Sequence, residues 1–247
     1  MDRRWCKLIL LISLLLIPSL CFAMPLWQVG GNIPIDCPSG TYLFAWNGDY
    51  PADTDKGCFT NGTVQKDGTL SGGTISTDYG QTGYGFRKTA NNQYLQWAVS
   101  GNDGINPAVG TMWMSVYVVD DGARTENTVF ESYVGSADFI AVASMATNYL
   151  CAWYYGNSSG NSLCSNPGTL SVGVWTRIAY SWDDSNNLHS YKIGAGSWVQ
   201  ESEAINTWIS AADKILIGES GTGGTETDTI YIDNVFILST YQAGDPL

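Results

Sequence analysis

The sequence has few charged residues and only one histidine. Charged side chains make up 14% of the 247 residues, against roughly 25% in typical domains, and Gly, Ser, Thr and Asn fill the difference. This composition suits an extracellular all-β protein. The single imidazole, His189, lies in the strand-like segment Leu188–Tyr191, and no Gly-x-Ser-x-Gly elbow accompanies it. We therefore expect a structural or surface role for His189 rather than nucleophilic catalysis.

Basic residues are also scarce. The chain has 11 Lys and Arg against 23 Asp and Glu, a net charge of −12. Such a surface repels nucleic acid and other polyanions at long range. We expect no nucleic-acid partner, and neutral glycans, cations or basic partners are better candidate ligands.

The first 23 residues have the pattern of a signal peptide. Arg3, Arg4 and Lys7 precede an apolar run over Leu8–Leu20, and small residues stand where a signal peptidase would cleave, after Ala23. The alternative is a membrane anchor, but the run contains Pro and Ser and is shorter than the roughly 20 residues that a span needs. Removal of the leader leaves 8 basic and 22 acidic residues, a net charge of −14. We expect a secreted or extracytoplasmic protein with no stable membrane anchor.

Four cysteines remain after the leader. An even number in an exported chain indicates disulfides, and four cysteines allow three pairings. The sequential pairing closes the shortest loops, and each bridge over such a loop stabilises by roughly 3 kcal/mol. Zinc is a weaker alternative, because the spacing is not that of ligand pairs and there is one histidine. The expected bridges are Cys37–Cys58 and Cys151–Cys164.

No helical periodicity of any length appears beyond the leader. Short runs rich in aromatic and β-branched residues alternate with clusters of Gly, Asn, Asp and Ser, which is typical of an antiparallel sandwich or barrel. We expect an N-terminal extension over 24–41, one all-β domain over 42–241 and a C-terminal tail over 242–247. The expected strands are Tyr42–Trp46, Tyr84–Lys88, Gln93–Val99, Thr111–Val119, Thr128–Val134, Phe139–Met145, Tyr149–Tyr155, Val174–Asp183, Leu188–Ile193, Lys214–Gly218 and Thr229–Leu238.

The strand over Val174–Asp183 has the clearest alternation. Its apolar face should carry Val174, Ile178, Tyr180 and Trp182, with Arg177 and Ser181 on the other face. Gly before the strand and Asp, Ser and Asn after it are turn residues. We expect a half-buried strand with its aromatic residues in the core.

The last strand contains a phase change. Its apolar positions run Ile230, Ile232 and then Val235, Ile237, so the alternation slips by one residue at Asp233-Asn234. An extra residue in a β-bulge explains such a slip. The bulge would aim Asp233 or Asn234 away from the core. Asp233 would then be either a solvated carboxylate at a sheet edge or a calcium ligand.

Several motifs, taken in order, resemble one family. They run over nearly all of the chain after the leader, and their order and spacing resemble the laminin-G-like domains of the concanavalin A-like lectin/glucanase superfamily. The segments that carry the resemblance are Tyr84–Phe86, Tyr94–Trp97, Gly110–Val118, Trp175–Asp183, Lys214–Gly218 and Ile232–Ile237.

The resemblance implies a jelly-roll sandwich of two antiparallel sheets. It also implies a calcium ion near the junction of the first and last strands, which suggests pairing Asp233 with Asn47 and Asp49. Members of the family bind glycans or proteins, and some relatives are glycosidases or polysaccharide lyases. The fold alone therefore does not choose a function.

Two segments are weakly similar to enzyme motifs of the superfamily. Glu201-Ser202-Glu203 resembles the paired carboxylates of glucanases, but the third carboxylate is absent, and a solvated turn is the better interpretation. Arg124–Glu126 with Tyr191–Gly194 resembles fragments of alginate-lyase signatures, but the element between them is missing. We expect no catalytic residues.

The segment over 151–164 is the best candidate for binding. Aromatic faces stack on sugar rings, amide groups bond to hydroxyls, and a bridge between Cys151 and Cys164 would limit the ordering cost. The alternative is that Trp153 and Tyr155 point into the core and the rest is a solvated hairpin. The expected carbohydrate-binding residues are Trp153, Tyr154, Tyr155, Asn157 and Asn161.

The sequence therefore predicts a secreted, disulfide-stabilised jelly roll that acts as a binding or adhesion module. A neutral glycan is the favoured ligand, and structural calcium is the expected cofactor. Two alternatives stay open: a polysaccharide-active enzyme of the same superfamily, and a structural surface protein that binds another protein.

Overall fold

The structure is a computed structural model. It describes residues 37–38, 40–49, 55–60, 62–101, 103–119, 127–135, 138–145, 147–208, 210–218 and 229–247. The expected leader over 1–23 lies outside these residues. The compact unit spans Asp36–Leu247. Within the described ranges, no helix has the length and apolar character needed to span a membrane.

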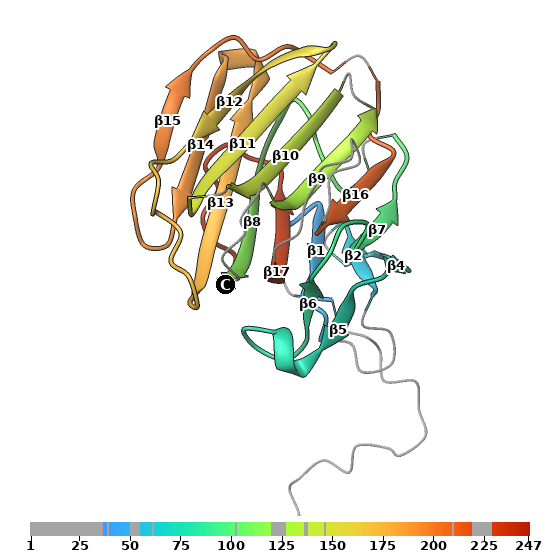
Figure 1. The fold of residues 1–247 in the computed structure, drawn as a ribbon. Coiled ribbons are helices and arrows are strands. Elements are labelled where there is room, and N and C mark those ends of the chain that lie inside the picture. The colour runs from blue at the N-terminus through green and yellow to red at the C-terminus, as the bar shows by residue number, and fades with distance from the viewer. Residues whose placement is uncertain are drawn as a thin grey trace, which may run out of the picture. The chain divides into compact units, whose positions relative to one another are not determined.

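Two antiparallel sheets pack face to face, as expected for a jelly-roll sandwich (Figure 1). The larger sheet has ten strands in the order β15-β14-β13-β8-β17-β1-β2-β3, with β6 also paired to β17 and to β5. Its strands are β1 (Phe44–Trp46), β2 (Gly57–Phe59), β3 (Val64–Lys66), β5 (Thr74–Ser76), β6 (Gly85–Lys88), β8 (Val109–Val118), β13 (Trp175–Asp183), β14 (Leu188–Ile193), β15 (Val199–Ser202) and β17 (Ile230–Leu238).

The second sheet has seven strands in the order β12-β11-β10-β9-β16-β7-β4. Two short 3-10 helices, η1 (Thr77–Tyr79) and η2 (Asp184–Asn186), lie in connections. The strands of this sheet are β4 (Thr69–Ser71), β7 (Tyr94–Ala98), β9 (Asn127–Gly135), β10 (Asp138–Met145), β11 (Tyr149–Gly156), β12 (Ser159–Cys164) and β16 (Lys214–Ile217).

All eleven expected strands are present, with ends within two residues of the predicted ones. The all-β prediction is therefore confirmed. Six strands were not expected, namely β2, β3, β4, β5, β12 and β15.

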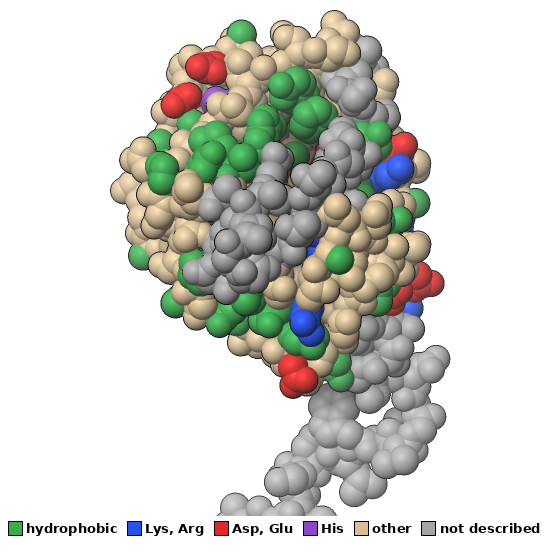
Figure 2. Space-filling model, viewed as in Figure 1, with side chains coloured by type: hydrophobic (Ala, Val, Ile, Leu, Met, Phe, Trp, Pro, Cys, Tyr) green, Lys and Arg blue, Asp and Glu red, His purple; other side chains and the backbone are tan. Residues whose placement is uncertain are grey.

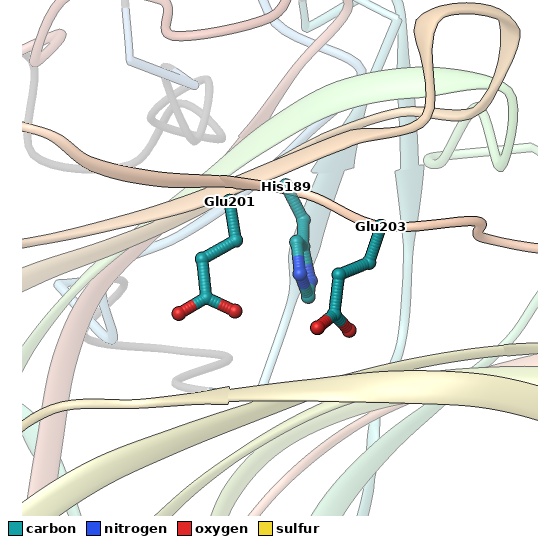
Figure 3. Close-up of side chains that lie close together, drawn as sticks. All are labelled: His189, Glu201 and Glu203. Atoms are coloured by element: carbon teal, nitrogen blue, oxygen red, sulfur yellow. The ribbon is translucent and has the colours of Figure 1, made fainter.

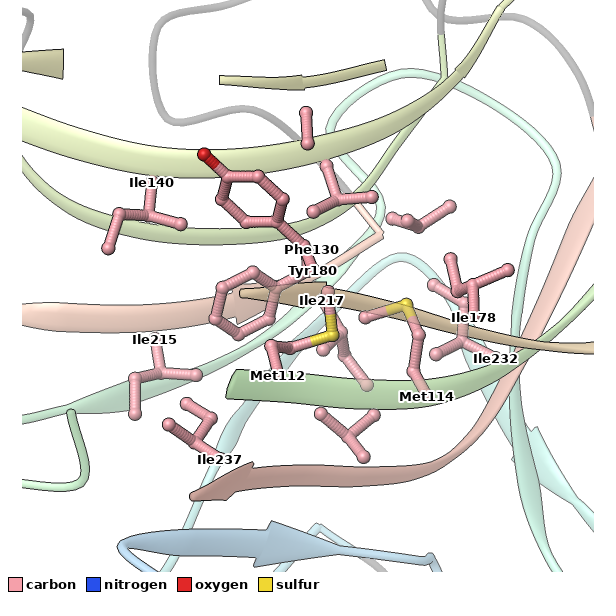
Figure 4. Packing of buried hydrophobic residues seen from close by; sticks show 14 of the residues in the cluster. Met112, Met114, Phe130, Ile140, Ile178, Tyr180, Ile215, Ile217, Ile232 and Ile237 are labelled. Atoms are coloured by element: carbon pink, nitrogen blue, oxygen red, sulfur yellow. The ribbon is translucent and has the colours of Figure 1, made fainter. Parts of the chain in front are cut away.

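The core lies between the sheets and is built from alternating residues of each strand. On β13, Ile178, Tyr180 and Trp182 are fully buried, as predicted. The prediction for Val174 is wrong: this residue precedes the strand and is 54% exposed. Figure 4 shows the centre of the packing, where methionines of β8 meet isoleucines of β16 and β17.

The bulge predicted in β17 is confirmed. The register with β8 shifts between Asp233, opposite Ser115, and Phe236, opposite Trp113, so β17 contains one extra residue. Asn234 takes up the shift with a φ of 52°. Because of this shift, apolar residues on both sides of the bulge reach the core.

Both predicted disulfides are present. Cys37 and Cys58 are joined across 21 residues, and Cys151 and Cys164 are joined across 13 residues. Cys151 and Cys164 stand directly opposite each other on β11 and β12. The first bridge fastens the segment before β1 to β2, and the second fastens the β11–β12 hairpin.

Candidate functional site

The hairpin of β11 and β12 presents one aromatic face to the outside of the seven-stranded sheet. Tyr154 is fully buried, and its hydroxyl donates to the carbonyl of Pro107 at 2.6 Å. Trp153 and Tyr155 are half-buried and, by alternation along the strand, lie on the opposite, outer face. Tyr154 is thus a core residue, and its prediction as a ligand contact is wrong. The alternative in which Trp153 and Tyr155 enter the core is also wrong.

Two further aromatic residues join this outer face. Phe139 of β10 stands opposite Tyr155, and their rings stack at 4.6 Å with an interplanar angle of 10°. Tyr133 of β9 stands opposite Phe139, and Lys214 of β16 lies over the Tyr133 ring at 5.2 Å. A row of aromatic side chains thus crosses β9, β10 and β11. Figure 2 shows hydrophobic side chains gathered on this side of the molecule.

We call Tyr133, Phe139, Trp153 and Tyr155 the outer aromatic row. Neighbouring strands lie about 4.8 Å apart, so the row extends over roughly 10 Å from Tyr133 to Tyr155. The sequence predicts Trp153 and Tyr155 but not Tyr133 and Phe139. Tyr133 and Phe139 could have been predicted only from the register in which β9, β10 and β11 pair. The residue pattern within one strand does not show that register.

The two predicted asparagines lie at the end of the same hairpin. Asn157 is exposed in the turn with a φ of 52°, and its backbone N–H donates to Asp138 Oδ1 at 2.7 Å. The side-chain amide of Asn161 donates to the carbonyl of Ala204 at 2.7 Å. Asn157 therefore presents its amide to solvent near the aromatic row, while Asn161 fastens β12 to the segment after β15.

The predicted calcium residues meet at one loop. Asp49 Oδ1 accepts from the N–H of Tyr84 at 2.8 Å, and Asp233 Oδ2 accepts from the N–H groups of Gln81 and Thr82 at 2.8 and 3.2 Å. Asn47 Oδ1 accepts from the N–H of Asp49 at 3.3 Å. The structure thus brings the three residues to the same place, where both carboxylates hold the backbone over 81–84.

Asp233 is fully buried, so the interpretation as a solvated carboxylate is wrong. Burial and the nearby carboxylate of Asp49 raise the pKa of Asp233 to about 7, against the lowering effect of backbone donors. One of these donors is the N–H of Asn234, at 2.6 Å from Oδ1. The buried charge is therefore only partly compensated by hydrogen bonds.

The segment similar to glucanase carboxylates is not a turn. Glu201 lies on the edge strand β15, and Glu203 follows its end; both side chains are exposed. The lyase-like segment Arg124–Glu126 lies outside the described residues.

Comparisons with known proteins identify the fold only. No family model and no curated protein match the sequence. Among solved structures, the receptor binding domain of botulinum neurotoxin C/D mosaic serotype is 10% identical, with a TM-score of 0.61 and coverage of 82% of this chain and 49% of that chain. The receptor binding domain of botulinum neurotoxin D has a TM-score of 0.62 at 10% identity, with 82% and 50% coverage. The binding domain of Paraclostridial Mosquitocidal Protein 1 has a TM-score of 0.60 at 13% identity, again with 82% and 50% coverage.

These similarities support the two-sheet β-sandwich fold. The chain spans about half the length of the solved structures that it matches. No function passes from them to this chain at such low identity.

Proposed function

We propose that this protein is an exported binding module that holds a neutral glycan on the outer face of its seven-stranded sheet. The observation that carries the proposal is the outer aromatic row, in which side chains from three neighbouring strands share one face. Aromatic faces stack against the apolar faces of sugar rings. Asn157, exposed at the end of the hairpin, adds an amide that can donate and accept hydrogen bonds.

Charge and fold both support a glycan as the ligand. The net charge of −12 disfavours polyanions, so a neutral sugar suits the surface better than a uronate or nucleic acid. The solved structures with this fold include a receptor binding domain of a botulinum neurotoxin and the binding domain of Paraclostridial Mosquitocidal Protein 1. The motif order supports a place within the laminin-G-like, concanavalin A-like group.

Two disulfides and the signal-peptide pattern support export.

The test is a glycan array followed by titration of the best neutral glycan. Trp153→Ala and Tyr155→Ala should each weaken binding at least about tenfold, because each removes one stacking face worth more than about 1 kcal/mol. Trp175→Ala is the matched control, since Trp175 is also half-buried but lies on the other sheet, against Tyr117 at 5.7 Å. Melting midpoints of all variants should be measured in parallel.

Each outcome bears on the proposal. Loss of binding in Trp153→Ala and Tyr155→Ala, with binding kept in Trp175→Ala, supports it. Glycan binding unaffected by either change places the ligand elsewhere and refutes the site. Binding to no glycan, but to a protein from the surroundings of the source cell, favours the protein-binding alternative. Release of reducing or unsaturated ends from a bound glycan would establish an enzyme.

A structural calcium ion at Asn47, Asp49 and Asp233 belongs to this proposal. The raised pKa of Asp233 supports it, because a divalent cation would offset both the burial and the repulsion from Asp49. Calcium should then raise the melting midpoint of the wild type and have little effect on Asp49→Asn. An unchanged midpoint with calcium and with chelator would remove calcium from the site.

A further inference from the structure

One side-chain cluster is not used by the proposed glycan or calcium sites. His189 of β14 stands directly opposite Glu201 of β15, and Glu203 is two residues further along, on the same side by alternation. Trp182, the partner of His189 on β13, belongs to the core, so the imidazole points to the inner side of the sheet, one strand in from the edge strand β15. Figure 3 shows the three side chains extending together, with the imidazole between the two carboxylates.

The three residues differ in burial in a way that suits a ligand set. His189 is fully buried, whereas Glu201 and Glu203 are exposed. A ligand atom from each of the three lies within 4.8 Å of the others. Two ligands of one zinc ion, each about 2 Å from it, are at most about 4 Å apart. The carboxylates must therefore move inward by roughly 1 Å, which rotation of exposed glutamate side chains allows.

The hydrogen bonding of the imidazole leaves one nitrogen unused. Nδ1 lies 3.4 Å from the hydroxyl oxygen of Tyr180, while Nε2 is buried and has no hydrogen-bond partner among the described residues. With the proton on Nδ1, the Tyr180 oxygen accepts it and the Nε2 lone pair is free. A metal-bound histidine has this arrangement: its second nitrogen donates to an oxygen that fixes the ring.

The charges around the imidazole also suit a cation. Burial lowers the pKa of His189, and this effect outweighs the opposite effects of Glu201 and Glu203. The imidazole and the two carboxylates offer electron-pair donors within 4.8 Å of one another, and a cation placed among them would be attracted by all three.

We propose that His189 Nε2 and the carboxylates of Glu201 and Glu203 form a site for a divalent transition-metal ion, with Zn²⁺ the best match. A ligand set of one nitrogen and two carboxylates suits zinc, whereas calcium and magnesium prefer oxygen ligands only. Three protein ligands leave a fourth position open, so the bound ion can accept an outside ligand at the rim of the sandwich. The site is separate from Asn47, Asp49 and Asp233 and does not depend on glycan binding.

The test uses the chain without an affinity tag, so that His189 is its only imidazole. Zinc is added to chelator-treated protein, and the imidazole nitrogens are followed by NMR while calorimetry measures affinity. We expect one bound ion and a large shift of the Nε2 resonance. Glu201→Gln and Glu203→Gln should each weaken zinc binding at least about tenfold, because each removes a ligand. Asp78→Asn is the control, because it removes an exposed carboxylate from η1, outside the proposed zinc site. This variant should bind zinc with the affinity of the wild type.

Two results would overturn the proposal. The first is that the imidazole nitrogen resonances do not shift when zinc is added, whether or not calorimetry detects bound zinc. The second is unchanged affinity in both glutamine variants. Because both glutamates are exposed, circular dichroism should show these variants folded, and the NMR result on the wild type stands without them.

Discussion

Arg177 and Asp245 form a bidentate ion pair between the first residues of β13 and the C-terminal segment. Arg177 Nε lies 3.0 Å from Asp245 Oδ2, and Nη2 lies 2.8 Å from Oδ1. Arg177 Nη1 also donates to the carbonyl of Asn234 at 2.6 Å, next to the bulge. Nearby, Trp113 Nε1 donates to the carbonyl of Ala243 at 3.0 Å. The last residues of the chain therefore cover part of the outer face of the larger sheet.

Asp245→Ala should lower the free energy of unfolding by about 1 kcal/mol, because the pair is bidentate and partly shielded from water. Urea unfolding at neutral pH measures the change. Asp67→Ala is the control: Asp67 pairs with Lys56 at 2.9 Å, but its side chain is 78% exposed. Its effect should be below about 0.5 kcal/mol. Equal effects of the two changes would show that the pair of Arg177 and Asp245 stabilises no more than an exposed ion pair.

The buried carboxylate of Asp233 should make stability depend on pH. Its pKa of about 7 in the folded protein exceeds the unfolded value of about 4. The folded state therefore binds the proton more tightly than the unfolded state. The stability contributed by the protonated form is complete below about pH 4 and is lost as the pH rises through about 7, by roughly 1.4 kcal/mol per pH unit within this window.

Asp233→Asn isolates this effect, because the amide does not titrate while other carboxylates stay the same. The difference in unfolding free energy between wild type and variant should change steadily between pH 4 and pH 7 without calcium. A difference independent of pH would show that Asp233 titrates normally. With calcium bound, the same difference should flatten, because a cation lowers the pKa of its ligand.

Strong alternation made most of the fold predictable from sequence. The strand with Ile178, Tyr180 and Trp182 and the slip at Asp233-Asn234 both follow from the period of two, and both are confirmed. The unexpected strands have weaker patterns. Thr69–Ser71 and Thr74–Ser76 are three-residue runs of mostly small polar residues, and Val199–Ser202 is exposed along its whole length. Such strands depend on neighbours that a local pattern does not show.

The sites were less predictable for a related reason. The segment over Tyr149–Gly156 is apolar on both faces, so alternation alone did not decide whether Trp153 or Tyr154 enters the core. The cluster at His189 was missed because it requires the pairing of β14 with β15. The spacing of Glu201 and Glu203 was a signal, but only the register places them beside the single histidine.

Changes at Tyr154 and Tyr155 should distinguish the core face of β11 from its outer face. Tyr154→Ala should destabilise by about 3–5 kcal/mol, as for other large buried aromatic residues. Tyr154→Phe should cost about 1 kcal/mol, because the carbonyl of Pro107 loses its donor. Tyr155→Ala, on the outer face, should cost clearly less than Tyr154→Ala. Thermal and urea unfolding of the three variants checks the order; equal costs for the two alanine variants would contradict the assignment of faces.

The two disulfides should be reduced in a fixed order. Reduction requires a thiolate to reach one sulfur of the bridge. Cys164 is exposed, whereas Cys58 is fully buried and Cys37 is half-buried. Under a mild reductant, alkylation followed by mass spectrometry should therefore find Cys151 and Cys164 labelled before Cys37 and Cys58. In denaturant the difference should disappear, because all four sulfurs are then accessible. Earlier labelling of Cys37 and Cys58 in the folded protein would mean that the segment before β1 opens more readily than the hairpin of β11 and β12.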